Sequence, residues 1–313
     1  MKTIEFIRNI VTIVSLRKVG TLVLSWLAYR LYPLNKNLLQ YSQPYAISFE
    51  PTSRCNLSCP ECPTGLGLIS RKQGFAEMDT FRNTIDAASR TAFVLVLYVQ
   101  GEPFLHKSLP EMITYGCKKG LFTMTSTNGH FLDSQRVKKI VDAGLHRLIV
   151  SVDGLDEEAY KSYRKGGSLP KVLEGIRKVV AYKNEQKKFF PIVELQFLVL
   201  STNEHQLPSM RKLAKDLGVR LRVKTAQFQD FKNGNALMPK NMKYSRYRLA
   251  ADGTYSLPTL RKRCWRMWAN PAVTWDGTVM PCCFDKDANY AYGNINFQNF
   301  RAIWQNNIRA SFA

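Results

Sequence analysis

The most informative stretch of this sequence covers residues 55–62 and reads Cys55-Asn56-Leu57-Ser58-Cys59-Pro60-Glu61-Cys62. Three thiolates this close together can converge on one site for a soft metal. A complete protein ligand set for a [4Fe–4S] cluster has four cysteines, so three cysteines leave one iron open. A small molecule can bind and react at an open iron. The stretch therefore favours an iron–sulfur site with a free coordination position.

Two other uses of these cysteines fit the chain less well. A structural zinc site usually pairs two C-x2-C knuckles or includes histidine, and only one C-x2-C is present here. A disulfide framework suits short secreted domains, whereas this chain has 313 residues, seven cysteines and no recognisable cleavable signal. An odd number of cysteines without such a signal predicts a cytoplasmic, reducing compartment in which thiols serve as ligands.

The charge of the chain predicts attraction to anionic partners. The formal net charge is +21 and the pI is about 9.8. Between Arg211 and Arg263 there are fourteen Lys or Arg against three Asp. Such a stretch suits acidic peptides, phosphorylated metabolites or a membrane, and equally a solvated, charge-rich surface. Nucleic acid is not expected as a partner, because no helix-turn-helix, zinc finger or RNA-recognition signature accompanies the charge.

Residues 1–44 form an apolar and basic N-terminal segment that we expect to be helical. Its longest uncharged stretch, 19–29, is too short to span a bilayer. Arg17 and Lys18 interrupt the apolar run that a secretory signal would need. Two interpretations stay open. The helices pack on the main domain, or they lie on an anionic membrane and place the protein peripherally on its inner face.

Strands and helices alternate from residue 45 to residue 228. This alternation requires a parallel sheet with helical crossovers, either closed as a barrel or open and doubly wound. No G-x-G-x-x-G follows the first strand, so a dinucleotide fold has no support. In a barrel, the loops after the strands share the face where active sites lie. The expected strands are 46–50, 93–99, 121–125, 147–152, 192–200 and 219–225, with helices at 78–89, 109–119, 134–143, 170–182 and 205–217.

Three further loops at these strand ends carry polar residues. Gly101 and Glu102 follow the second strand in the sequence Q-G-E-P, and Asn128 follows the third strand in S-T-N-G. Ser151 and Asp153 end the fourth strand and, being two residues apart, point to the same side. Each loop alone would also suit an ordinary turn. Together they place polar groups around the cysteines.

A second group of cysteines, Cys264, Cys282 and Cys283, lies near the C-terminus. Residues 272–281 predict a β-hairpin, because Asp-Gly is the preferred two-residue turn. The hairpin places Cys282 opposite Pro271 and brings Cys264 towards the other two thiols. Buried free cysteines in a small hairpin subdomain are the alternative interpretation.

The cysteine spacing and the order of the loops resemble the radical S-adenosylmethionine (radical SAM) superfamily. There the open iron of a [4Fe–4S] cluster holds the amino and carboxylate groups of SAM. The resemblance covers about residues 45–228 and implies a partial (β/α)6 barrel of the TIM type. The implied catalytic cluster ligands are Cys55, Cys59 and Cys62. The implied SAM-binding residues are Gly101, Glu102, Asn128, Ser151, Asp153 and Arg164.

Two positions depart from the family pattern. Gln100 replaces the first glycine of the G-G-E-P element that holds the SAM amino group. The residue before the third cysteine is often aromatic and touches adenine, but here it is Glu61.

The C-terminal thiols resemble the opening of a SPASM or shorter twitch extension, which holds an auxiliary [4Fe–4S] cluster. The implied metal ligands are Cys264, Cys282 and Cys283. Relatives carry further cysteines downstream, so we expect the ligand set here to be incomplete, either because the chain is truncated or because substrate or another chain completes the set. The expected organisation is an N-terminal helical segment at 1–44, a core barrel at 45–228, a basic linker at 229–263 and the extension at 264–313.

The resemblance implies reductive cleavage of SAM to a 5′-deoxyadenosyl radical that abstracts hydrogen from a substrate. An auxiliary cluster that accepts an electron from the substrate radical makes the net change an oxidation. The implied partner is a small electron donor of the flavodoxin or ferredoxin type. The charge favours a peptide or other anionic substrate, as in peptide-maturase relatives. The alternatives are a carbohydrate or alcohol dehydrogenase and a non-catalytic iron–sulfur or membrane-surface binding protein.

Overall fold

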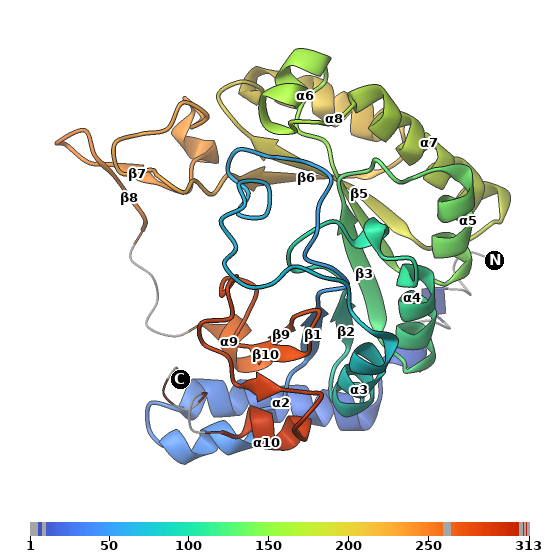
Figure 1. Cartoon of the computed structure of the whole chain (residues 1–313), viewed down its shortest axis with the longest axis vertical. Helices are drawn as coiled ribbons and strands as arrows, with labels where there is room; N and C mark the ends of the chain where they lie inside the picture. Colours follow the sequence, from blue (N-terminus) through green and yellow to red (C-terminus); the bar gives the residue numbers. More distant parts are fainter. Residues whose placement is uncertain (1–5, 8–10, 259–263, 307–308, 310, 312–313) are drawn as a thin grey trace.

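The computed structural model describes residues 6–7, 11–258, 264–306, 309 and 311. Its main sheet contains six parallel strands in sequence order. This arrangement confirms the predicted partial barrel (Figure 1). The six are β1 (Ala46–Phe49), β2 (Val94–Val96), β3 (Phe122–Thr127), β4 (Arg147–Ser151), β5 (Ile192–Val199) and β6 (Arg220–Thr225).

Helices follow the strands and cover the outer side of the sheet (Figure 1). Asp133 caps the helix after β3 as predicted, since its Oδ1 accepts from Arg136 N at 2.9 Å. The sequence prediction missed α6, a helix of seven residues. The helices are α3 (Met78–Ala88), α4 (Leu109–Lys118), α5 (Ser134–Asp142), α6 (Glu157–Tyr163), α7 (Leu169–Glu185) and α8 (Leu207–Asp216), with short 3-10 turns η2 (Pro103–Leu105) and η3 (Glu204–Gln206).

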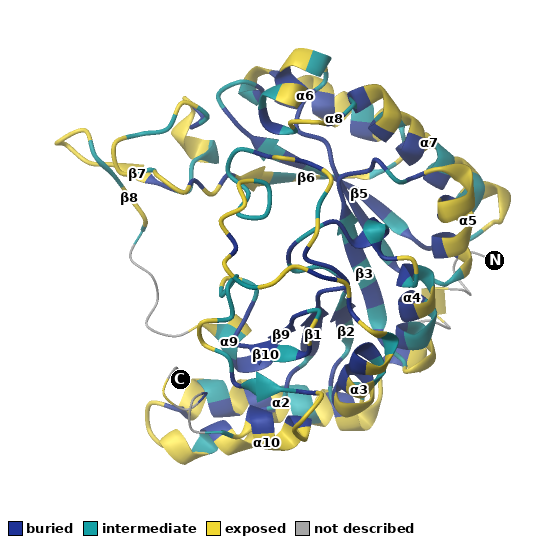
Figure 2. Cartoon of the chain, viewed as in Figure 1, coloured by how far each residue is buried: buried dark blue, intermediate teal, exposed yellow. Residues whose placement is uncertain are grey.

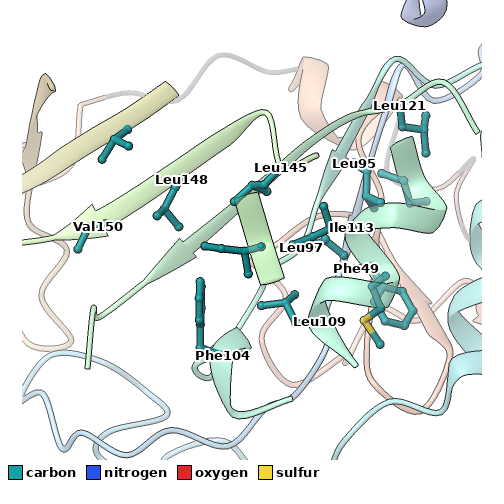
Figure 3. Packing of buried hydrophobic residues seen from close by; sticks show 14 of the residues in the cluster. Phe49, Leu95, Leu97, Phe104, Leu109, Ile113, Leu121, Leu145, Leu148 and Val150 are labelled. Carbon is teal, nitrogen blue, oxygen red and sulfur yellow. The ribbon is translucent and has the colours of Figure 1, made fainter. Parts of the chain in front are cut away.

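The two faces of the sheet differ in polarity. Side chains alternate along each strand, so one set meets the helices and the other lines the inner face. Figure 3 shows Leu95, Leu97 and Leu148 packed in the core on the helix side. The register pairs Ser151 with Gln196 and Gln196 with Arg222, which puts these three on the other face. The barrel interior is therefore polar near its last strands.

The C-terminal hairpin extends the same sheet. Strand β9 (Ala272–Val273) pairs parallel to β1 and antiparallel to β10 (Thr278–Met280), which pairs with β11 (Gly293–Asn294). The predicted hairpin register is wrong by one residue, because Val279 faces Val273. Gly277 has a φ of +88° and ends a turn closed by Gly277 N donating to Thr274 O. The connection is therefore a three-residue loop.

The remaining elements flank the sheet. Helix α2 (Leu16–Leu31) and the 3-10 turn η1 (Lys36–Tyr41) precede β1, and α9 (Trp265–Ala269) and α10 (Phe300–Trp304) belong to the extension. The linker carries η4 (Met242–Tyr244), β7 (Arg248–Leu249) and β8 (Tyr255–Ser256). Parts of the predicted N-terminal segment, linker and extension lie outside the described residues. Among the described helices, none has the length and apolar character needed to cross a bilayer.

Candidate active site at the cysteine loop

The three cysteines of the first group lie in the loop after β1, and Gly101 packs directly against this loop. Gly101 has a φ of +73°, and a Cβ at this position would lie 2.5 Å from Thr52 O and 2.7 Å from Arg54 O. A side chain does not fit there, and the backbone conformation itself favours glycine. The glycine after β2 therefore allows the cysteine loop to approach the neighbouring strand end.

All three thiols of the loop are free, with Cys59 buried and Cys55 and Cys62 half-buried. The Cys62 N donates to Cys59 O at 3.2 Å, so the chain turns between these two residues. Burial raises the pKa of Cys59 to about 11, although the charge of Arg164 favours the thiolate. Metal binding at this loop would thus release protons from the thiols.

Asn128, which follows β3, joins the sheet to the cysteine loop. Its Nδ2 donates to Asn56 Oδ1 at 2.8 Å and contacts Cys55 Sγ at 3.9 Å. Its Oδ1 accepts from His130 Nδ1 at 3.0 Å, while His130 Nε2 accepts from Ser168 N at 2.8 Å. The histidine is therefore neutral with its proton on Nδ1, consistent with burial lowering its pKa. This chain of bonds fixes the Asn128 amide beside the thiol.

Glu102 is a fully buried carboxylate that holds the ends of β2 and β3 together. Burial raises its pKa to about 7, against the effect of its hydrogen bonds. Its oxygens accept from Thr127 Oγ1 at 2.8 Å, Phe104 N at 3.1 Å and Asn128 N at 2.7 Å. The Glu102 side chain therefore positions the Asn128 loop, and its contact with SAM stays a prediction.

Arg164 and Asp153 form a buried ion pair beside Cys59. Two guanidinium nitrogens of Arg164 donate to Asp153 Oδ2 at 2.6 and 2.5 Å, and Asp153 Oδ1 accepts from Leu198 N at 2.7 Å. The Nη1 of Arg164 contacts Cys59 Sγ at 3.9 Å. A positive charge is therefore held next to the cysteine loop, where it favours thiolates and other anions.

The structure brings most of the predicted barrel residues into one connected group. Contacts link the cysteine loop to Asn128, Glu102, Asp153 and Arg164, and Gly101 packs on the same loop. Ser151 lies on the inner face at the end of β4, in register with Gln196. These observations show proximity, and the roles as cluster ligands and SAM contacts stay predictions.

The sequence prediction missed Glu50, a buried carboxylate at the end of β1. Both Nη atoms of Arg71 donate to it, at 2.8 and 2.5 Å, and the backbone N atoms of Gln100 and Trp275 donate at 3.2 and 3.3 Å. The Nε of Arg71 also donates to Lys286 O at 2.7 Å. One carboxylate thus joins the cysteine loop, the β2 loop and the extension. No local motif could reveal it, because these partners are up to 225 residues away in sequence.

Glu61 connects the cysteine loop to the linker. Its Oε2 accepts from Gln229 N at 2.8 Å, and its Oε1 accepts from Asn235 Nδ2 at 2.9 Å. The residue that replaces the family's aromatic position is therefore used to fasten the chain that leaves the barrel.

Strand β6 presents positive charge to the barrel interior. Its residues Leu221 and Val223 pack against the core, so Arg222 and Lys224 take the opposite face. The sequence singled out the high charge of this region, but only the strand register reveals that part of the charge faces inward.

The charge of a third cation, Arg266 of the extension, acts on Lys224 together with that of Arg222, and we call these three residues the inner cation cluster. Partial burial of its ammonium group lowers the pKa of Lys224, and the charges of Arg222 and Arg266 lower it further, although all three residues are exposed to solvent. Arg222 lies 3.5 Å from a carboxylate oxygen of Glu194. Arg266 Nη1 contacts Cys283 Sγ at 3.8 Å. The cluster therefore lies between the last barrel strands and the extension thiols.

The extension thiols come from two separate pieces of chain. Cys264 is exposed at the start of α9, whereas Cys282 is buried and Cys283 is half-buried after β10. Burial raises the pKa of Cys282, and the negative charges of Cys283 and Cys264 raise it further. Cys264 thus lies near the other two thiols despite the wrong hairpin register.

The donor sets at both places suit iron–sulfur clusters, since each offers three free, soft thiols near one another. In the part of the chain that the structure describes, no group of three or more His, Cys, Asp or Glu is arranged to hold a single metal ion. Each cysteine of a [4Fe–4S] site binds its own iron, so such thiols need not meet at one point. The residues at both places therefore fit such clusters.

Known proteins with related sequences support this interpretation. Residues 49–214 match the Radical SAM superfamily, and residues 264–313 match SPASM, an iron–sulfur cluster-binding domain. The chain is 26% identical over 284 residues to the tungsten-containing aldehyde ferredoxin oxidoreductase cofactor-modifying protein of Pyrococcus furiosus, covering 82% of this chain and 79% of the relative. It is 27% identical over 284 residues to the PqqA peptide cyclase of Gluconobacter oxydans, covering 84% and 77%.

Solved structures share the fold at low sequence identity. The anSMEcpe structure with bound AdoMet has a TM-score of 0.63 and 18% identity, covering 86% of this chain and 82% of that one. Streptococcus suis SuiB bound to the precursor peptide SuiA has a TM-score of 0.65 and 12% identity, covering 90% and 70%. The family match covers more than half of the sequence. The chain therefore belongs to the radical SAM superfamily, with a [4Fe–4S] cluster and SAM as cofactors and a SPASM iron–sulfur domain at residues 264–313.

Proposed function

We propose that this protein is a radical SAM oxidoreductase that abstracts a hydrogen atom from an anionic peptide or small molecule. The observation that carries the anionic substrate is the inner cation cluster: Arg222 and Lys224 lie on the inner face of β6, and the charge of Arg266 acts on Lys224 from the extension. When bound at the cysteine loop, the [4Fe–4S] cluster would supply one electron that splits SAM into methionine and the 5′-deoxyadenosyl radical that takes the substrate hydrogen.

The chain's own residues supply the binding and placement. The thiolates of Cys55, Cys59 and Cys62 would hold the first cluster, and the extension thiols would contribute to the auxiliary one. Arg164 is oriented by Asp153 and offers its remaining nitrogen towards the cysteine loop, where it suits the SAM carboxylate. The Asn128 amide, fixed by Asn56 and His130, is a polar contact at the same loop.

The inner cation cluster would bind the anionic group of the substrate. Like charges held close together repel, and a bound carboxylate or phosphate relieves that repulsion. Glu194, at 3.5 Å from Arg222, offsets only part of the charge. Because Arg266 also contacts Cys283, a substrate held here would lie beside the extension thiols. An auxiliary cluster held by these thiols would supply an electron acceptor at that position, as a net oxidation requires.

Deuterium transfer tests the substrate class without knowing the substrate. An extract of peptides and metabolites from cells grown in heavy water is separated by anion exchange. Each fraction is then incubated anaerobically with the reconstituted protein, SAM and dithionite. Mass spectrometry of 5′-deoxyadenosine reports hydrogen taken from a deuterated substrate. We expect deuterium from retained, anionic fractions, and none with Cys59→Ala.

The variant Arg222→Gln/Lys224→Gln separates the two parts of the proposal. It should still form unlabelled 5′-deoxyadenosine, but deuterium transfer should fall at least about tenfold, as for the loss of a charge-assisted contact. The control Arg211→Gln/Lys212→Gln changes two cations on α8 and should transfer deuterium normally. Transfer only from unretained fractions would exclude the anionic substrate, and no 5′-deoxyadenosine from the wild-type protein would exclude radical chemistry.

A further inference from the structure

Helix α2 (Leu16–Leu31) turns a side of mixed polarity towards the protein and most of its large apolar side chains towards solvent. Its buried residues are Lys18, Ser25 and Ala28. A surface helix of a globular protein normally shows the reverse pattern. Figure 2 shows this helix at the lower edge of the molecule, with exposed positions along it. The exposed apolar residues are Leu16, Val19, Val23, Leu24, Trp26, Leu27 and Leu31.

Specific contacts hold the polar side of α2 in place. Lys18 Nζ donates to Gly120 O at 2.7 Å, and burial lowers the pKa of Lys18. Ser25 Oγ donates to Gln43 O at 3.0 Å and accepts from Gln43 N at 2.8 Å. Towards its C-terminal end the helix also packs Ala28 in an apolar cluster with Trp268 of α9. These polar bonds and this cluster together fix the helix with its other apolar residues facing outward.

The exposed apolar surface is concentrated at this end of the chain. Among the described residues, 22 large hydrophobic side chains are exposed, and twelve of them lie within residues 6–34. At 100° per residue, the exposed apolar positions of α2 span one side about 160° wide, and Arg30 lies within the same arc. Contiguous apolar surface of this kind marks a site of interaction with a protein or a membrane.

Charge decides between these two partners. No acidic residue occurs between Glu5 and Glu50, whereas Arg17 and Arg30 lie on α2. The guanidinium of Arg30 lies 5.7 Å from the centre of the Trp26 ring. Two copies of this helix would bring like charges together, but a surface of anionic lipid headgroups would attract them. Tryptophan beside arginine is also a combination that suits the membrane interface.

We propose that α2 docks the protein on the surface of an anionic membrane. Its apolar side enters the boundary between headgroups and acyl chains, and Arg17 and Arg30 pair with lipid phosphates. This inference does not depend on the reaction that the barrel performs.

The N-terminal residues contact the amino ends of the barrel strands. Phe6 packs on Phe189 before β5, with ring centres 5.1 Å apart, and Lys18 bonds Gly120 before β3. The cysteine loop follows the carboxyl end of β1. Docking through α2 thus leaves the cysteine loop facing away from the membrane, where an aqueous electron donor can approach.

Vesicle flotation of the full chain tests the proposal. The probes are vesicles of phosphatidylcholine alone and of phosphatidylcholine mixed with phosphatidylglycerol. Wild-type protein should float with the anionic vesicles at least about tenfold more than with the neutral ones, and added salt should weaken the effect. The variant Leu24→Glu/Leu27→Glu should lose flotation. The matched control Leu249→Glu/Leu257→Glu changes two exposed leucines of the linker and should float normally.

A second measurement keeps the test independent of folding. Lipids with brominated acyl chains should quench part of the tryptophan fluorescence of the wild type and not of Trp26→Phe, while the circular dichroism of both stays the same. If the wild-type protein stays at the bottom of the gradient while both the neutral and the anionic vesicles float, the proposal is overturned. A dimer that forms in solution and dissociates only in Leu24→Glu/Leu27→Glu would instead assign this face to a second copy.

Discussion

The two groups of thiols differ in how the fold supports them. The loop with Cys55, Cys59 and Cys62 is continuous in sequence and is contacted by residues that follow β2, β3 and α6. The extension thiols come from two pieces of chain, and Cys264 is exposed. The barrel site is thus largely preorganised, whereas the extension site depends more on metal to hold its parts together.

The largest effect should come from the buried ion pair of the barrel site. Asp153→Asn leaves Arg164 buried without its charge partner, because both side chains are largely enclosed. We expect a loss of about 3–5 kcal/mol in the free energy of unfolding, measured by urea denaturation. The matched control Glu174→Gln removes an exposed helix pair with Lys178 and should change stability by less than about 1 kcal/mol. Equal effects of the two variants would contradict a special role for the buried pair.

A smaller loss is expected where β2 meets the cysteine loop. Gly101→Ala places a methyl group against the carbonyls of Thr52 and Arg54 and requires a positive φ, so it should cost about 2–4 kcal/mol. Gly253→Ala shares a positive φ but meets nothing within 4 Å, and should cost about 1–2 kcal/mol. Thermal or urea unfolding measures both. If the two alanines cost the same, the close approach of the loop does not matter.

Because Glu102 is buried, we expect the free energy of unfolding to change with pH by about 2 kcal/mol. Its pKa is raised from 4.5 to about 7 by burial, so the folded state disfavours the ionised carboxylate. The contribution of protonated Glu102 to the free energy of unfolding is therefore complete below pH 4.5 and is lost as the pH rises towards 7. Between pH 5 and pH 7 the wild type should lose about 2 kcal/mol relative to Glu102→Gln. A constant difference between the two proteins over this range would show that Glu102 does not titrate there.

The smallest effect on folding is expected at the exposed thiol of the extension. Cys264→Ser should change the unfolding free energy of the metal-free protein by less than about 0.5 kcal/mol, because the side chain is exposed. It should nevertheless lower the iron content after anaerobic reconstitution. Unchanged iron in this variant would remove Cys264 from the auxiliary ligand set.

The sequence predicted the barrel well because its signals are local. Apolar runs and the residues that end helices depend on a few neighbours, so the six strands appear close to their expected positions. The motifs also identified loops that do meet, because parallel strands bring their carboxyl ends to one edge.

The side-chain partners could not be predicted in the same way. Glu50 binds Arg71 and the backbone of Trp275, and no sequence motif around Glu50 indicates either partner. The hairpin register failed for a related reason. Asp-Gly favours a two-residue turn locally, but the bonds around Thr274 select a three-residue loop. Packing of distant pieces of chain decides both features.

Cleavage of SAM by two sets of variants tests the central comparison most directly. One set replaces Cys55, Cys59 and Cys62 with alanine, and the other replaces Cys264, Cys282 and Cys283. The 5′-deoxyadenosine formed with dithionite and SAM is measured by mass spectrometry. We predict that the first variant forms none and that the second still forms it. Loss of 5′-deoxyadenosine only in the second variant would contradict the assignment of SAM cleavage to the barrel loop.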